Sequence, residues 1–493
     1  MGGPVDMPLL AVGGSPMKSV IARVFIWLLA LAAGRIDASA QDFARMTPEE
    51  RQAYFARIQE DSHRDWRAMM DRLAIVEPAL PPPSEDPRRP SGLVQREGST
   101  NWFDAAGRFH VRSNWGHWTN YADSLNGNPR LPDPLVTGDG RPVSDAGTWW
   151  NARRPEILEL YRREVYGRIP PDVPSPRFEA TSVDSTALGG TAIVKQVVGT
   201  IDNSRYPAAT PRIVLTMILP RAADGPVPVI LRIGGFWGWS PERGVDGLPG
   251  DVRQVLQKGW GFVAFDPYAL QADHGAGLAE GIIGLVAAGQ PREPDQWGAI
   301  AAWSWGLSRA LDYFETDPMV DARRVAVQGH SRFGKTALVA GAFDERFAIV
   351  WPSCSGSMGA SLEKRNNGET IDNVASSSEY HWMAGNFLKY GGDWDAMPVD
   401  AHLLMAAIAP RPLFVTAATE DSWTDQEGMF LAAVAAGPVY RLLGARGLQT
   451  EVMPPPDTTL ADGDLAWRMH EGGHTDAPDW EAFLAFAGRY LGR

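Results

Sequence analysis

Apolar residues recur at helical spacing early in this chain, directly after a helix start signal: Phe55, Ile58, Trp66, Met69, Met70 and Leu73. The signal is Thr47-Pro48-Glu49-Glu50, in which Thr47 can cap the helix and Glu50 can complete a capping box. Proline suits the first helical position. The pattern predicts one or two amphipathic helices that reach about Ile75 and pack on the main body.

The hydrophobic pattern changes at about Trp149, and from there short apolar runs alternate with helical patterns. A helix is predicted from Arg154 to Tyr166, because Gly167 and Pro170 follow it. The remaining predicted strands lie at 213–219, 229–233, 262–265, 325–330, 347–351 and 412–416, and the remaining helices at 300–314 and 478–491. Strands that alternate with helices indicate an α/β fold with a mostly parallel sheet covered on both faces.

Two segments separate these patterns. The proline-rich stretch Pro78–Pro90 cannot continue a helix and is predicted to be an extended linker. Residues 99–121 are both aromatic and polar, which fits either a surface that stacks on sugar rings or the buried packing of an insertion. We therefore expect an N-terminal segment at 41–130 and a catalytic domain at 131–493.

The first forty residues carry a secretion signature. A basic segment begins at Met17, the apolar run Val24–Ala33 is too short to span a bilayer, and Ala38-Ser39-Ala40 resembles a cleavage site. We expect a leader at 1–40 that contains a signal peptide, Met17–Ala40, and a secreted or periplasmic bacterial protein free of the membrane after cleavage. The alternative is a retained membrane anchor.

Charge and cysteine content narrow the partners. The net charge of −13 argues against nucleic acid or an anionic membrane surface. Cys354 is the single cysteine of the chain, so an internal disulfide is impossible. The 44% hydrophobic content is enough for a large core, and we expect a monomer.

The chemistry centres on the stretch Val325–Lys335, VAVQGHSRFGK. An apolar strand leads into a sharp turn at Ser331, and a helical pattern follows, which is the order of a nucleophile elbow in an α/β-hydrolase fold. Gly329 and Gly334 would allow the turn to approach the helix closely. The spacing is G-x-S-x-x-G instead of G-x-S-x-G, and the alternative is a tight turn that merely exposes a serine.

A serine nucleophile needs a base, and His474 lies where such a histidine belongs, before the last helix. The sequence His470-Glu471-Gly472-Gly473-His474 also matches the H-E-x-x-H zinc motif. Paired glycines disfavour the helix that this motif requires, so we expect a glycine-rich loop, no metal and a structural His470.

The acid that orients the base follows the penultimate strand in this fold. Glu420, Asp421 and Asp425 all lie there, and Asp421 is preferred, with Glu420 left open. Arg332, directly after the nucleophile, could stabilise an oxyanion or lie on the helix surface. Lys335, about one turn later, could point into the pocket or into solvent.

These motifs together resemble those of glucuronoyl esterases: GHSRFGK at 329–335, WGAIAAWSWGLSRALDYFETD at 297–317, SCSGSMGA at 353–360, DAHLLMAAIAPRPLF at 400–414 and HEGGHT at 470–475. The resemblance covers 131–493. It implies an α/β hydrolase that cleaves the ester between 4-O-methyl-glucuronic acid on xylan and lignin alcohols without a cofactor. Its implied roles are nucleophile for Ser331, base for His474 and oxyanion donor for Arg332, with substrate contacts from Lys335, Glu369 and Trp423.

One departure concerns the acid. Fungal members have a Glu-Ser-Gly run where this chain has Cys354-Ser355-Gly356, and a thiol cannot replace the carboxylate. The acid must therefore come from the later loop, which favours Asp421. The expected substrate is a glucuronoxylan or lignin–carbohydrate ester, and nucleic acid is not expected as a partner. Alternatives are acetyl-xylan or feruloyl ester cleavage, or a non-catalytic xylan-binding protein.

Overall fold

The computed structural model describes residues 46–492 except 98, 100, 123–129 and 236–246. The predicted leader and signal peptide lie outside the described residues. Within the described ranges, no helix has both the length and the apolar character needed to cross a membrane.

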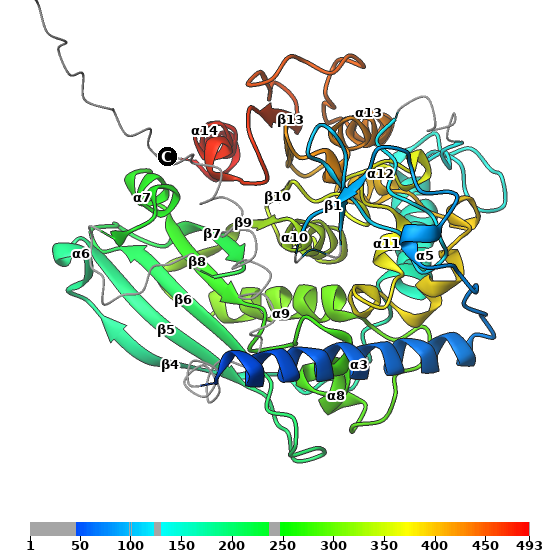
Figure 1. The fold of residues 1–493 in the computed structure, drawn as a ribbon. Helices are drawn as coiled ribbons and strands as arrows, with labels where there is room; N and C mark the ends of the chain where they lie inside the picture. The colour runs from blue at the N-terminus through cyan, green and yellow to red at the C-terminus, as the bar shows by residue number, and fades with distance from the viewer. Residues whose placement is uncertain (1–45, 98, 100, 123–129, 236–246, 493) are drawn as a thin grey trace, which may run out of the picture.

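A large mixed sheet forms the centre of the molecule, in the order β12-β13-β11-β10-β9-β7-β8-β6-β5-β4 (Figure 1). The strands from β13 to β8 in this order run parallel, and the others pair antiparallel. The bounds are β4 Arg177–Asp184, β5 Ala192–Thr200, β6 Arg212–Pro220, β7 Val227–Ile233, β8 Gly261–Asp266, β9 Val320–His330, β10 Ile349–Ser353, β11 Leu413–Ala418, β12 Thr459–Leu460 and β13 Leu465–His470.

Helices cover both faces of the sheet. One face packs on α7 (Gly250–Gln257) and α14 (Trp480–Leu491), through residues such as Trp351 and Phe483. The opposite face packs on α9 (Ala299–Phe314), α10 (Arg332–Phe343), α12 (Ala401–Ala406) and α13 (Gln426–Leu442). Figure 1 shows the two layers on either side of the strands. The predicted α/β-hydrolase architecture is confirmed.

The N-terminal helix α3 spans Pro48–Arg72 and begins as its capping box predicts. The Thr47 hydroxyl accepts from the Glu50 N–H at 3.2 Å, and the Glu50 carboxylate accepts from the Thr47 N–H at 2.7 Å. Trp66, Met69 and Met70 are buried against the main body. Figure 1 shows α3 as a long blue helix across the lower part of the molecule, and its Ser62 contacts the short helix η7 (Gly275–Ala279).

The helix predicted from Arg154 begins earlier in the structure. It runs through α4 (Ala146–Thr148), a π-helical turn at Trp149–Arg153, α5 (Arg154–Leu160) and a second π-helical turn at Tyr161–Val165. Asp145 provides the start, because its side chain accepts from the Thr148 N–H at 2.8 Å. The predicted start at Arg154 was therefore wrong, since Pro155 lies within a helix that is already formed.

The proline-rich and aromatic segments are anchored to the body. Asp86 is buried and pairs with Arg112 at 2.8 Å, which ties the proline-rich stretch to the segment that follows it. That segment forms a small antiparallel sheet of β1 (Val94–Gln95), β2 (Trp102–Phe103) and β3 (Phe109–His110). The Asn120 carbonyl accepts from the Gly368 N–H at 2.8 Å, so the segment reaches the catalytic body.

Candidate active site

Ser331 occupies a strained turn between β9 and α10. Its φ of 60° and ψ of −131° lie in a backbone region that residues with a side chain rarely adopt. A Cβ on Gly329 would lie 2.0 Å from the Phe333 carbonyl oxygen, and one on Gly334 would lie 2.9 Å from the Ser355 Cβ. Both positions therefore need glycine. The geometry of a nucleophile elbow is present despite the longer spacing.

His474 lies beside this turn and is paired with Asp421. Its Nδ1 is 2.7 Å from Asp421 Oδ2, and its ring centroid is 4.3 Å from that of His330, the residue before Ser331. The His474 side chain is 40% exposed, whereas Asp421 is only 7% exposed. Burial raises the pKa of Asp421, but the His474 ring and the Thr424 hydroxyl outweigh it and lower the pKa. The carboxylate is thus suited to orient an imidazole.

The other two acids of this loop lie elsewhere. Glu420 is exposed, and its backbone N–H donates to the Gly472 carbonyl at 2.8 Å. Asp425 is buried and its carboxylate accepts from the Arg365 Nε at 3.1 Å. Of the three acids considered, the structure brings Asp421 to His474.

His470 holds the loop that carries His474 in place. The His470 Nδ1 is 3.0 Å from Asp479 Oδ2, and its Nε2 is 3.2 Å from the Gly473 carbonyl oxygen. His470 ends β13, and Gly472 has a φ of 118°, so the H-E-x-x-H stretch is a strand followed by a turn. His470 and His474 therefore pair with different carboxylates and do not share a helix face.

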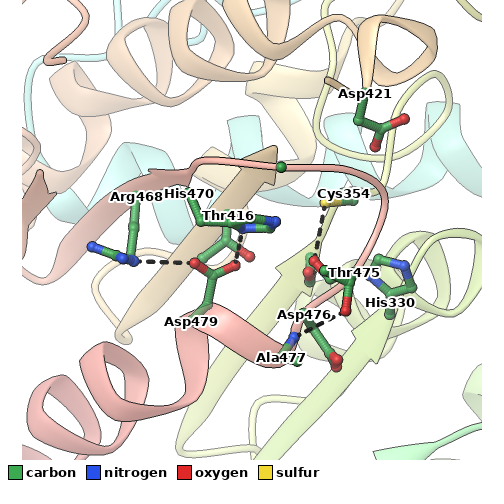
Figure 2. Close-up of polar contacts among 12 residues, drawn as sticks. His330, Cys354, Thr416, Asp421, Arg468, His470, Thr475, Asp476, Ala477 and Asp479 are labelled. Atoms are coloured by element: carbon green, nitrogen blue, oxygen red, sulfur yellow. Dashed lines mark hydrogen bonds and ion pairs between the residues drawn. The ribbon is translucent and has the colours of Figure 1, made fainter. Parts of the chain in front are cut away.

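Cys354 also touches this loop. Its Sγ is 3.8 Å from the Thr475 carbonyl oxygen, and its Sγ, an Asp421 oxygen and a His474 nitrogen lie within 4.8 Å of one another. Figure 2 shows Thr475 against Cys354, with His330 close by. Burial, with Asp421 and Asp479 nearby, raises the pKa of Cys354 well above its ordinary value, so the thiol stays neutral.

On the C-terminal side of Ser331 in the chain, the Arg332 side chain is held by Asp273. Arg332 Nη1 lies 2.6 Å from Asp273 Oδ2, and the guanidinium lies over the Trp382 ring at 5.2 Å. Asp273 is fully enclosed and also accepts from Trp382 Nε1 at 2.6 Å and His381 Nε2 at 3.0 Å. Burial by itself raises the pKa of Asp273, but Arg332 and these donors lower it far below its usual range. The arginine is a fixed charge at the elbow.

Lys335 and Glu369 form a buried ion pair beneath the loop after β10. Lys335 Nζ donates to Glu369 Oε2 at 2.7 Å and to the carbonyls of Ser355 and Ser357 at 2.8 and 2.5 Å. An ammonium group has three donors, so these acceptors use all of them. The Glu369 carboxylate also accepts from the Ser357 N–H at 3.1 Å. The pair therefore supports the loop that passes beside the elbow.

Trp423 lies in the short helix Ser422–Thr424, directly after Asp421. Its ring packs at a tilt against Phe109, with the ring centroids 4.7 Å apart, and Phe109 comes from the N-terminal aromatic segment. Its carbonyl accepts from the Glu369 N–H at 2.7 Å. Trp423 thus connects the acid loop, the ion pair and the N-terminal segment.

Sequence reasoning missed Asp273 and Glu379. Glu379 lies near Arg332 and Lys335, and its Oε2 has no hydrogen-bond partner among the described residues. Burial, followed by the nearby Glu369 carboxylate, raises the pKa of Glu379 to about 8, so it is mostly a neutral acid at pH 7. No local motif marks either residue, because only the fold brings Asp273 into contact with Arg332 and Glu379 near it.

An elbow serine, a histidine–carboxylate pair and an arginine fixed by a buried carboxylate define an ester hydrolase of the α/β-hydrolase class. Comparison with known proteins narrows this class to one family of carbohydrate esterases. A family model described as "Glucuronyl esterase, fungi" matches residues 209–444. The chain is 35% identical over 405 residues to a carbohydrate esterase of an unknown prokaryotic organism, which covers 76% of this chain and 92% of that protein.

Solved structures agree. A glucuronoyl esterase from Teredinibacter turnerae is 36% identical with a TM-score of 0.73, covering 87% of this chain and 99% of that one. One from Solibacter usitatus is also 36% identical, with a TM-score of 0.67, and covers 75% of this chain and all of that one (100%). This chain belongs to the glucuronoyl esterase family.

Proposed function

We propose that this protein hydrolyses the ester between (4-O-methyl-)glucuronic acid of glucuronoxylan and a lignin alcohol, with Ser331 as the nucleophile. The observation that carries the assignment of roles is the elbow at Ser331, flanked by His474–Asp421 on one side and Arg332–Asp273 on the other. The relatives named above are carbohydrate and glucuronoyl esterases, which supports this substrate class.

The reaction begins when His474 Nε2 takes the proton of Ser331 Oγ as the serine attacks the C6 carbonyl of the uronate. The Nδ1–H of His474 donates to Asp421, which fixes the tautomer and stabilises the imidazolium. Arg332 and the first N–H groups of α10, which lack intrahelical acceptors, stabilise the tetrahedral oxyanion. His474 then protonates the departing alcohol, and water hydrolyses the acyl-enzyme by the same steps in reverse.

The sugar is bound by the polar groups around the elbow. Lys335 and Glu369 form the floor of this subsite and Trp423 its wall, as the family resemblance implies. Since Lys335 is fully paired, a hydroxyl contact requires it to exchange one of its carbonyl acceptors. Glu379, as a neutral acid near Arg332, donates a hydrogen bond to a ring oxygen or hydroxyl.

The protein acts outside the cytoplasm as a monomer, with the leader at 1–40 removed and the segment at 41–130 packed on the catalytic domain at 131–493. The basic and apolar pattern before Gln41 supports export. No observation favours an acetyl-xylan or feruloyl esterase or a non-catalytic binder over this function.

The test compares methyl and benzyl esters of glucuronic acid with acetylated xylan and a feruloyl ester at matched concentrations. We expect the glucuronate esters to be preferred, and Ser331→Ala to lower kcat by about 10⁴-fold or more. Circular dichroism checks that the variant is folded. Full activity of Ser331→Ala would refute the mechanism, and a preference for acetyl or feruloyl esters would refute the substrate assignment.

A further inference from the structure

The N-terminal helix α3 contacts both loops that hold the acceptor of Arg332. The first loop contains Asp273 and continues into the short helix η7 (Gly275–Ala279). The Ser62 hydroxyl of α3 accepts from the Ala276 N–H of this loop at 2.9 Å. A Cβ on Gly275 would lie 2.9 Å from the Ser62 Cβ, so loop and helix are in close contact.

The second loop contains the short helix η9 (Tyr380–Trp382), which supplies His381 and Trp382 to Asp273. The Tyr380 hydroxyl donates to Asp65 Oδ2 of α3 at 2.6 Å and lies 3.1 Å from the Ser62 carbonyl oxygen. Burial, followed by the Asp65 carboxylate, raises the pKa of Tyr380, so its hydroxyl remains a donor at any working pH.

Apolar packing on the same face of α3 adds to these hydrogen bonds. Trp66 is fully buried, and its Nε1 donates to the Ala375 carbonyl at 2.9 Å, shortly before η9. A Cβ on Gly385, shortly after η9, would lie 2.5 Å from the Met69 sulfur. The residues that make these contacts follow helical spacing: Ser62, Asp65, Trp66 and Met69. One face of α3 therefore packs against both loops.

We propose that α3 is a positioning element of the active site, which acts through Ser62, Asp65 and Tyr380 on Asp273 and thereby on Arg332. The inference rests on the proposed role of Arg332 in ester hydrolysis. Asp273 lies on the first loop and accepts from His381 and Trp382 of the second, so a shift of either loop against the other moves the carboxylate that fixes the guanidinium. A charged donor that is displaced by a fraction of an ångström stabilises a transition state less well.

The contribution of α3 to catalysis should appear in kcat and not in KM. An oxyanion exists in the transition state and not in the bound ester, so a misplaced arginine weakens binding of the transition state alone. A general loss of folding would instead lower the fraction of active enzyme and the melting temperature. The two effects can be separated because α3 affects catalysis through one identified side chain, that of Arg332.

The experiment measures kcat and KM for benzyl glucuronate with Tyr380→Phe and Asp65→Ala, each made in the wild type and in Arg332→Ala. In the wild type we expect kcat to fall about tenfold, with KM changed less than about twofold. In Arg332→Ala we expect the same substitutions to change kcat by less than about twofold, because the group they position is gone. The matched control is Asp61→Ala, which removes a carboxylate four residues earlier on α3 that pairs with the exposed Arg64, and which should leave kcat unchanged.

An equal fall in kcat with and without Arg332 would overturn the inference, and so would an unchanged kcat in both substitutions on the wild-type background. Tyr380→Phe removes a single oxygen, so it remains informative if Asp65→Ala proves unstable. If Arg332→Ala itself leaves kcat unchanged, the proposed role of Arg332 fails. If Arg332→Ala lowers kcat but the α3 variants do not, the proposed function stands and only the positioning role fails.

Discussion

The two sides of Ser331 are built differently. On one side His474 projects from a glycine-rich loop, its side chain is 40% exposed, and one carboxylate holds it. On the other side Arg332 is 22% exposed and is fixed by Asp273, which is itself fully enclosed by donors from a second loop. A base must collect and release protons and must admit water, whereas an oxyanion donor works best when it is fixed before the reaction. The difference in burial fits the tasks that we propose for the two residues.

The largest effect on this comparison is expected from Asp421→Asn on the histidine side. The substitution keeps the shape of the side chain but removes the charge that orients His474, and it should lower kcat by about 10⁴-fold, as in a serine protease with the equivalent change. Steady-state kinetics on methyl glucuronate measures it. Glu420→Gln, one residue earlier and exposed, is the matched control and should remain within twofold of the wild type. Similar losses in both variants would contradict the assignment of the acid.

On the arginine side, Arg332→Ala should lower kcat by about 10²- to 10³-fold and change KM by only a few-fold, because the guanidinium acts on the charge that develops in the transition state. Arg309→Ala is a control, since it removes an arginine of α9 that pairs with Asp312 and not with Asp273. The split between kcat and KM is the decisive readout. A raised KM with an unchanged kcat would make Arg332 a binding residue instead.

The two sides also differ in how much the sequence predicted. The elbow and the histidine loop are encoded locally, in Val325–Lys335 and in the glycine-rich stretch before α14, so a strand-turn-helix pattern and chain order were enough to locate them. The preference for Asp421 over Glu420 also matches the observed contact with His474. Asp273 was missed because it precedes Arg332 by 59 positions and no motif surrounds it. Only the folded chain brings its carboxylate to the guanidinium.

The fold shows the same division. The helix α3 was predicted correctly because its capping box and its apolar face lie within one short stretch. The edge strand β4 was not predicted. Most of its residues are exposed, so the sequence has no apolar run there. The early start at Ala146 was missed because the prediction placed the helix start at Arg154-Pro155, whereas Asp145 caps the helix well before that proline. Strong local signals were therefore recoverable, whereas an exposed strand and a helix cap that precedes a more conspicuous proline were not.

The smallest effect is a pH dependence of stability, and it concerns how the loop that carries His474, the proposed base, is held in place. Both ring nitrogens of His470 face acceptors, Asp479 Oδ2 and the Gly473 carbonyl, so the doubly protonated ring satisfies both. Burial and the nearby Arg468 lower the pKa of His470, but Asp479 and Gly473 outweigh them and raise it. The charged ring therefore stabilises the fold at pH values below the unfolded pKa of about 6.5, and this stabilisation is lost as the pH rises through the higher pKa of the folded state.

We expect the wild type to lose about 1.4 kcal/mol of unfolding free energy for each pH unit between those two pKa values, apart from other titrations. Urea unfolding from pH 6 to pH 9 measures it. His470→Gln has an amide that can donate to both acceptors and does not titrate, so its stability should not show this alkaline loss. Asp479→Asn removes the charge that raises the pKa and should shift the loss to lower pH. Parallel profiles for the wild type and His470→Gln would show that a neutral ring holds the His474 loop.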